Sequence, residues 1–348
     1  MSLFTEVQCP AGTPPVQCLD HFLEQAERAD RLGYHGIWIA EIHFQPEFSV
    51  FSAPYPVLGA VSQRTERLRM GVAVNIPPVH HPLELAEEAA TLDVLSHGRM
   101  DFAIGRGHPP TRVYEGYGMD REQARGMMEE SLQIILGAWT RDVLTFGGRY
   151  YRIPEVVVNP KPIQNPHPPI YTAVSSVDGV EYAARLGINI FLPTHTLNRE
   201  RLKECSVAYW NALRSHGHGE TQRDLGLLVP VHIAQNATLA QRNVRTGIMD
   251  YYRVIGKTRN EYKEWLEGRG VDTSGLRPPS WTGMTFERVC AEHVVLADPE
   301  TAVRELRSFA EATGANHLLL WMNMGSIPHP LVLESMERFA HGVKPRLR

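Results

Sequence analysis

The sequence predicts an α/β protein with the fold of a (β/α)8 TIM barrel that carries insertions. Short apolar segments alternate with amphipathic segments along the chain, which indicates parallel strands joined by helical crossovers. Eight such apolar segments occur within the 348 residues, a number that favours a closed barrel over an open sheet. Barrels of this class commonly exceed about 250 residues as one unit, so we predict a single domain over residues 1–348.

The predicted strands are short runs rich in Val, Ile, Leu and aromatic residues, most of them followed by turn-forming residues. They cover 3–9, 36–40, 69–76, 100–104, 169–174, 188–192, 225–234 and 317–322. The segment 20–32 illustrates the helices between them: Phe22, Ala26 and Ala29 recur at helical spacing, and Gly33 ends the segment. The other predicted helices end at 63 or cover 83–95, 120–139, 180–186, 200–214, 239–267, 299–313 and 330–342.

Two segments are longer than a minimal barrel repeat requires. Residues 146–169 begin with a hairpin-like sequence, and residues 256–292 include a loop rich in glycine and proline. Long excursions from a compact barrel usually serve as lids, specificity loops or dimer contacts. We therefore expect these two insertions to modify a barrel rather than to form separate domains.

Composition excludes several classes of function. A net charge of −4 shows no basic surface for nucleic acid, and no apolar run is long enough to cross a membrane. The four cysteines, Cys9, Cys18, Cys205 and Cys290, are scattered without a CxxC pair. We expect them to be reduced in a cytoplasmic protein, and the N-terminal segment has no signal-peptide pattern.

The strand predicted over 100–104 ends in the turn Gly105-Arg106-Gly107, which His108 follows. The two glycines allow the backbone to approach a ligand, and the forked guanidinium of Arg106 suits a phosphate group. The alternative is a loop at the end of a strand with an arginine on the surface. The segment by itself leaves both interpretations open.

Polar side chains follow several other predicted strands. Glu41 and His43 follow the second, Asn75 ends the third, and Ser175 and Ser176 follow the fifth. Because barrel enzymes place their chemistry at these strand ends, the residues form a candidate site. The serines could bind phosphate through the start of the following helix, or they could only cap that helix. Without a nucleophile–base pair, a phosphorylated cofactor is favoured over hydrolysis.

The sixteen histidines require a metal site to be considered. The first predicted strand ends without a His-x-His pair, and the eighth contains no acidic residue. His80 and His81 are adjacent and would point in opposite directions in an extended chain. His232 lies in an apolar strand and is interpreted as a core residue. We predict no catalytic metal.

An ordered series of segments resembles the bacterial-luciferase-like flavin-dependent monooxygenase family. The segments are 37–44, 65–74, 81–82, 92–99, the turn 105–107, 146–151, 160–164, 168–170, 183–187 and 335–340. They span nearly the whole chain, and the similarity is weakest over about 240–290. The resemblance supports the barrel that the strand pattern predicts.

The resemblance implies a flavin monooxygenase. Members use reduced FMN as a diffusible cosubstrate, and a C4a-peroxyflavin formed with O2 would oxygenate a small, apolar organic molecule. An NAD(P)H-dependent flavin reductase and a homodimer are the implied partners, with no nucleic acid or membrane.

The resemblance also assigns site residues. Arg106, Ser175 and Ser176 would bind the FMN phosphate, and Gly105 and Gly107 would lie beside the cofactor. Ala73 and Val74 would form a non-prolyl cis peptide beside the flavin ring. Asn75 could bind the polar edge of the flavin or cap its strand.

Two departures from the luciferase pattern limit the catalytic assignment. Ile42 stands where the luciferase α-type pattern has its first histidine, and Gly105 stands where luciferase has a cysteine. Light emission is therefore not expected, and His43 and His108 remain as catalytic candidates. The alternatives are an F420-dependent hydride-transfer enzyme, a non-catalytic flavin-binding subunit and a metal-dependent barrel hydrolase.

Overall fold

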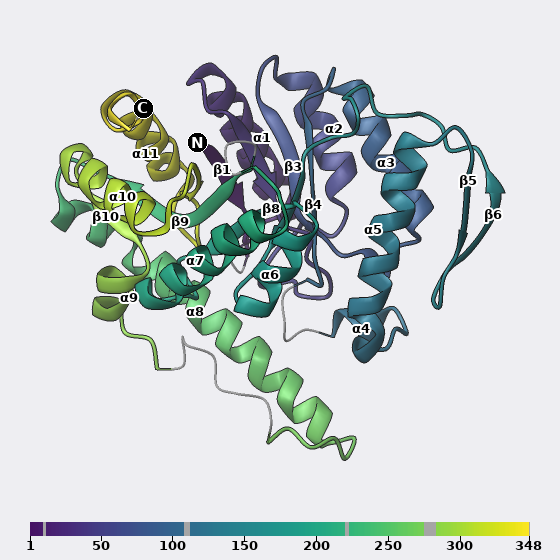
Figure 1. Ribbon diagram of the computed structural model, residues 1–348. Helices are drawn as coiled ribbons and strands as arrows, with labels where there is room; N and C mark the ends of the chain where they lie inside the picture. Colours follow the sequence, from purple (N-terminus) through teal and green to yellow (C-terminus); the bar gives the residue numbers. More distant parts are fainter. Residues whose placement is uncertain (10–11, 108–111, 220–222, 275–282, 348) are drawn as a thin grey trace.

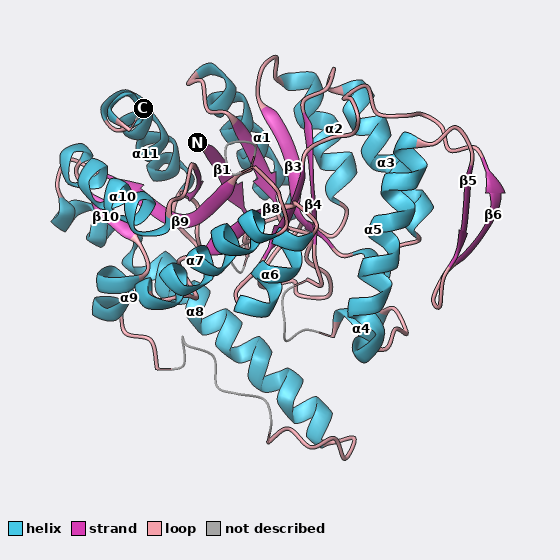
Figure 2. Ribbon diagram, viewed as in Figure 1, coloured by secondary structure: helices cyan, strands magenta, loops and turns pink. Residues whose placement is uncertain are grey.

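A computed structural model describes residues 1–9, 12–107, 112–219, 223–274 and 283–347. Eight parallel strands form a closed barrel (Figure 2) in the order β1-β2-β3-β4-β7-β8-β9-β11, and β11 pairs with β1 to close it. Their bounds are β1 Ser2–Thr5, β2 Gly36–Ile39, β3 Arg69–Asn75, β4 Met100–Ile104, β7 Ile170–Ala173, β8 Asn189–Pro193, β9 Leu225–Ile233 and β11 His317–Trp321. The predicted barrel is confirmed.

Helices connect the strands and pack around the outside of the barrel (Figure 1). They are α1 Pro15–Arg31, α2 Pro54–Arg64, α3 Pro82–Leu95, α4 Val113–Gly116, α5 Ala124–Thr140, α6 Val177–Arg185, α7 Arg199–Ser215, α8 Ala237–Glu267, α9 Phe286–Glu292, α10 Pro299–Thr313 and α11 His329–Gly342. Several begin at side-chain caps: Asn198, Asn236 and Asp298 each accept a hydrogen bond from a backbone N–H of the first turn. These local signals fix where the helices start.

Aromatic side chains fill the interior of the barrel. Trp38 of β2 is 2% exposed and packs edge-on against Tyr171 of β7 and Phe191 of β8, with ring centroids 5.1 and 5.0 Å apart. Phe4 of β1 meets Trp321 of β11 at 5.2 Å in the same way. The barrel centre is therefore a packed core, and side chains that follow the strands lie above it.

Two strands differ from the sequence-based expectation, and the short helices α4 and α9 were not predicted. The first strand ends at Thr5 instead of Cys9, because the chain turns at Val7, whose φ is 37° and whose N–H bonds Thr5 Oγ1 at 3.0 Å. A short strand, β10 Val295–Ala297, pairs with β9 outside the closed barrel. Its three residues are too few to produce a recognisable alternation.

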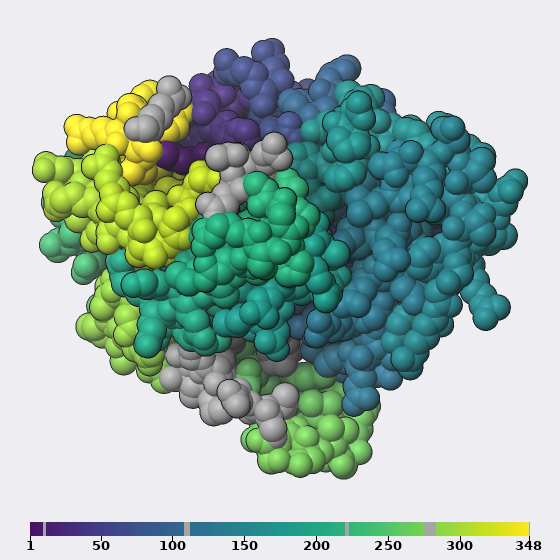
Figure 3. Space-filling view, in the orientation of Figure 1, coloured from purple at the N-terminus to yellow at the C-terminus, as the bar shows by residue number. Residues whose placement is uncertain are grey.

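The two long excursions leave the barrel in different forms. The first contains the antiparallel hairpin of β5 Leu144–Gly147 and β6 Arg152–Val156, which projects at one side in Figure 1. The carboxylate of Glu130 on α5 accepts hydrogen bonds from three backbone N–H groups in the turn between β5 and β6. The second begins in α8, whose end protrudes at the lower edge of the molecule (Figure 3).

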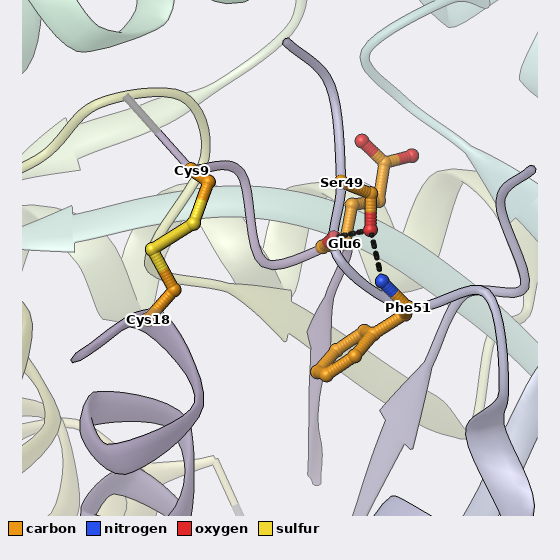
Figure 4. The surroundings of a disulfide bond; sticks show 5 residues. All are labelled: Glu6, Cys9, Cys18, Ser49 and Phe51. Atoms are coloured by element: carbon orange, nitrogen blue, oxygen red, sulfur yellow. Dashed lines mark hydrogen bonds between the residues drawn. A yellow bond between two sulfur atoms is a disulfide. The ribbon is translucent and has the colours of Figure 1, made fainter. Parts of the chain in front are cut away.

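The cysteine prediction is wrong for one pair. Cys9 and Cys18 form a disulfide, with Cα atoms 6.0 Å apart (Figure 4), whereas Cys205 and Cys290 are free. The turn after β1 carries Cys9 back against the first turns of α1, a proximity that the nine-residue spacing did not reveal. Among the described helices, none has the length and apolarity needed to cross a membrane.

Candidate functional site

A cavity of about 400 Å³ opens at the carboxyl ends of the barrel strands. Its volume lies within the range of about 300–1,000 Å³ that is usual for small-molecule sites. The walls are largely apolar, and six polar side chains interrupt them: Glu6, Glu41, Arg106, Ser175, His195 and Thr196. This is the edge at which the sequence predicted a site.

One side of the cavity offers a cation. Arg106 follows β4, is exposed, and its guanidinium makes no hydrogen bond or ion pair with any residue that the structure describes. Tyr114 holds the backbone at this position by donating its hydroxyl to the Arg106 carbonyl at 2.5 Å. Ser175, which follows the neighbouring strand β7, lines the same cavity. A guanidinium and a hydroxyl on adjacent strand ends suit an anionic group.

The second serine acts locally. Ser176 is the N-cap of α6, and its Oγ accepts a hydrogen bond from the N–H of Gly179 at 3.3 Å. Ser176 therefore caps α6, which is the alternative to phosphate binding that the sequence left open. Ser175 is the serine that faces the cavity.

The glycines of the turn are required by one side chain of β3 and one that directly follows it. A Cβ at Gly105 would lie 2.5 Å from Val74 Cγ2. At Gly107, φ is +71° and a Cβ would lie 2.7 Å from Ile76 Cδ1. Larger residues would therefore separate the turn from β3. Both glycines also line the cavity, as the cofactor prediction requires.

The end of β3 has the backbone that the family resemblance implied. The Ala73–Val74 peptide bond is cis, and both residues line the cavity. Asn75 is fully buried, and its side-chain amide donates to the carbonyl of Ala103 at 2.8 Å. Asn75 thus joins the end of β3 to β4 by a hydrogen bond, in agreement with the alternative that it caps its strand.

A buried carboxylate, Glu41, gathers two histidines beside the cavity. Glu41 Oε1 lies 2.7 Å from His43 Nε2 and 2.6 Å from His80 Nε2, and Oε2 accepts the N–H of Ile76 at 2.9 Å. Tyr117 adds its hydroxyl at 3.2 Å from His43 Nδ1. We call Glu41, His43 and His80 the carboxylate–histidine cluster.

Hydrogen bonds decide the charge of this cluster. Burial alone would raise the pKa of Glu41, but the bonds from His43 and His80 hold it below its usual range. Burial would lower the pKa of His80, but its bond to Glu41 raises it. The hydrogen bonds thus shift the pKa of Glu41 toward the ionised form and the pKa of His80 toward the protonated form.

The cluster can position a proton donor or acceptor. When His43 Nδ1 accepts from the Tyr117 hydroxyl, Nε2 carries the proton that is donated to Glu41. His43 itself lines a smaller hollow that adjoins the main cavity and shares Glu41 and Arg106 with it. His108, the second catalytic candidate, lies outside the described residues.

The same three residues form the one set of metal-ligand atoms found close together in the described chain. Their donor atoms lie within 4.8 Å of one another. Both rings direct Nε2 to a single carboxylate oxygen, so an ion there would displace two short hydrogen bonds. His232, interpreted as a core residue, is 2% exposed and bonds Asn243 at 3.2 Å.

Sequence reasoning missed three site residues. His80 was dismissed as a ligand, although it follows β3, the neighbour of the strand that Glu41 follows. Glu6 and His195 follow β1 and β8, and both line the cavity. His80 and His195 lie shortly beyond predicted strands, which was the signal that could have identified them, whereas Glu6 fell inside the first predicted strand, which was drawn too long.

A family model described as luciferase-like monooxygenase matches residues 1–317. The chain belongs to the luciferase-like monooxygenase family. The family resemblance seen in the sequence is thus confirmed, and the membership accounts for the barrel with its site at the strand ends.

Relatives of this luciferase-like monooxygenase include the oxygenase component of a flavin-dependent trigonelline monooxygenase from Acinetobacter baylyi. That protein is 26% identical over 94% of this chain and 90% of its own length. The alkanal monooxygenase alpha chain of Photobacterium leiognathi is 24% identical over 97% and 96%.

A solved structure shows the same fold. It is the oxygenating constituent of 3,6-diketocamphane monooxygenase from Pseudomonas putida, a type II Baeyer-Villiger monooxygenase in complex with FMN. It superposes with a TM-score of 0.81 at 19% identity, over 100% of this chain and 99% of that one.

Proposed function

We propose that this luciferase-like monooxygenase is an oxygenase that uses reduced FMN and O2 to oxygenate a small, mostly apolar organic molecule. The single observation that carries the cofactor assignment is the position of Arg106, an unpaired guanidinium among the described residues, beside Ser175 at one rim of a largely apolar cavity. The names of the relatives, which include a flavin-dependent monooxygenase and an alkanal monooxygenase, support the same reaction class.

The residues of the cavity fit this group. Arg106 and Ser175 would hold the phosphate, and the backbone of Ala73, Val74 and Gly105 would lie along the ring system. Reduced FMN, when bound, supplies the electrons that activate O2. The apolar walls exclude water from the reacting atoms, and Glu41, which lines the cavity, is held by its hydrogen bond to His80.

We further propose that a separate NAD(P)H-dependent flavin reductase supplies reduced FMN. The name "oxygenase component" of the trigonelline relative supports this division of labour. A homodimer in the cytoplasm completes the proposal. Sedimentation of the purified chain tests the dimer, and turnover that depends on an added reductase tests the partner.

The test of the cofactor site compares two ligands that differ in one phosphate. Arg106→Ala should weaken FMN binding about tenfold to a hundredfold, because a charge-assisted contact worth about 1.5–3 kcal/mol is lost. Riboflavin, which lacks the phosphate, should bind the variant and the parent equally. Flavin fluorescence quenching measures both affinities.

Arg149→Ala provides the matched control, because it removes an exposed arginine on the hairpin turn, away from the cavity. It should bind FMN as the parent does. Equal losses of FMN and riboflavin in Arg106→Ala would show that Arg106 is not at the phosphate. Binding of F420 in preference to reduced FMN would replace the oxygenase proposal with hydride transfer.

A further inference from the structure

Glu6 is a buried carboxyl group that the site described so far does not use. It directly follows β1, is 6% exposed, and lines the main cavity. Its Oε2 is buried without a hydrogen-bond partner, and its carboxyl group makes no hydrogen bond or ion pair with the described residues. Figure 4 shows the carboxyl group on the side opposite the ring of Phe51, a residue of the loop between β2 and α2.

The backbone holds Glu6 in this position. The Ser49 hydroxyl donates to the Glu6 carbonyl and accepts from the N–H of Phe51 at 3.0 Å. The next residue, Val7, has a φ of 37°, a strained value for a β-branched residue. Such strain persists where the surrounding structure imposes it, and it is common at functional sites. The carboxyl group is thus oriented by the turn and not by partners of its own.

Among the described residues, no cation or hydrogen-bond donor contacts the Glu6 carboxyl group. The cavity lining includes Phe4 of β1, Leu228 of β9, Leu319 of β11 and Ala40, which directly follows β2. Tyr251 of α8, 1% exposed, has a hydroxyl without a partner, and the nearby Glu6 adds to burial in raising its pKa. Glu41, Arg106 and His195 are the other titratable groups of the cavity. Burial raises the pKa of Glu6 well above its usual range.

The place of Glu6 in the barrel separates it from the phosphate side. In the strand order, β1 lies four positions from β7 in either direction, so the two strand ends face each other across the cavity. Ser175 follows β7 and Arg106 follows β4. A cofactor anchored there leaves the wall at Glu6 for the molecule that reacts with it.

We propose that Glu6 is a neutral carboxylic acid that donates a hydrogen bond to the oxygen of an otherwise apolar substrate and thereby selects carbonyl compounds. This inference rests on the proposed function for the identity of the reaction. An apolar wall with one oriented donor binds a molecule that has a hydrophobic body and one acceptor. A ligand with such an acceptor pairs with the Glu6 carboxyl group, whereas a ligand without it leaves that group unpaired. The difference between the two cases produces specificity.

The test uses camphor and camphane, which share a carbon skeleton and differ in the carbonyl oxygen, with the FMN-loaded protein. The parent should bind camphor more tightly than camphane. Glu6→Gln, which keeps a neutral donor, should retain the preference within about threefold, whereas Glu6→Leu should lower it about tenfold or more. Calorimetric titration measures both ligands, and FMN affinity should be unchanged in both variants.

A second readout requires neither turnover nor folding of the leucine variant. The infrared spectrum of the parent at pH 7 should contain the carbonyl stretch of a protonated carboxyl group, and Glu6→Gln should lack it. An ionised Glu6 in that spectrum overturns the inference, as does a camphor preference that is absent in the parent or intact in Glu6→Leu. A parent that prefers an N-methylpyridinium cation to camphor, and loses this preference in Glu6→Gln, would also overturn the inference. Binding of that cation would require an ionised Glu6. If the parent protein does not bind FMN, the proposed function itself is contradicted.

Discussion

Two glutamates lie at neighbouring strand ends, Glu6 after β1 and Glu41 after β2. They are buried to the same extent but differ in their hydrogen bonds. They are 6% and 5% exposed, and both line the same cavity. Glu41 accepts three hydrogen bonds, two of them from histidines, whereas the Glu6 carboxyl group has no partner among the described residues.

The comparison teaches that burial by itself does not decide the charge of a carboxyl group. Burial raises the pKa of Glu6 well above its usual range, and at Glu41 the same effect is outweighed by donated hydrogen bonds. Two carboxyl groups whose pKa values are shifted in opposite directions can act as hydrogen-bond donor and acceptor within one site. Four predictions test this difference.

The largest effect should come from truncating the partnered carboxylate. Glu41→Ala should lower the free energy of unfolding by about 3 kcal/mol, because it leaves the buried His43, the half-buried His80 and a backbone N–H without their acceptor. Glu6→Ala removes the same atoms on the adjacent strand and should cost less than about 1 kcal/mol, since no hydrogen bond is lost. Urea unfolding measures both, and equal losses would remove the distinction between the two sites.

A smaller effect concerns pH. Glu41 raises the pKa of His80 above its usual 6.5 in the folded chain. The stability that this bond contributes is therefore fully present below pH 6.5 and is lost as pH rises through the raised pKa. His80→Asn should flatten this decline. A parent and a variant that lose stability in parallel between pH 6 and 8 would show that His80 is not the charged partner.

Glu6 should have a different pH signature. Its raised pKa means that the folded chain penalises ionisation, so its stability penalty develops as pH rises above the usual value of 4.5. The penalty is absent when the residue is an amide. The thermal midpoint of Glu6→Gln should therefore exceed that of the parent increasingly from pH 4 to pH 8. A constant difference would contradict a neutral Glu6.

The smallest effect is expected at the edge of the carboxylate–histidine cluster. Tyr117 is 43% exposed, and its hydroxyl lies 3.2 Å from His43 Nδ1. Tyr117→Phe should change the free energy of unfolding by less than about 0.5 kcal/mol, because water can replace the exposed hydroxyl. A loss comparable to that of Glu41→Ala would show that the cluster extends to Tyr117.

Local sequence patterns were enough to predict the barrel and the place of Arg106 at the end of one of its strands. Apolar runs located the eight barrel strands, because a strand buried on both faces requires continuous apolar residues. The Gly105-Arg106-Gly107 turn at the end of β4 then indicated an anion site. Strand β10 escaped notice because three residues carry no periodicity.

The sequence by itself determined the barrel, its family and the position of Arg106 at a strand end, because these depend on neighbouring residues. Only the tertiary structure decided that Cys9 pairs with Cys18, and that Glu41, and not Glu6, meets histidine. Glu41 and His80 are 39 positions apart and meet only because adjacent strands end at the same rim. The charge of a buried carboxyl group depends on such partners, and partners are brought together by the closed sheet.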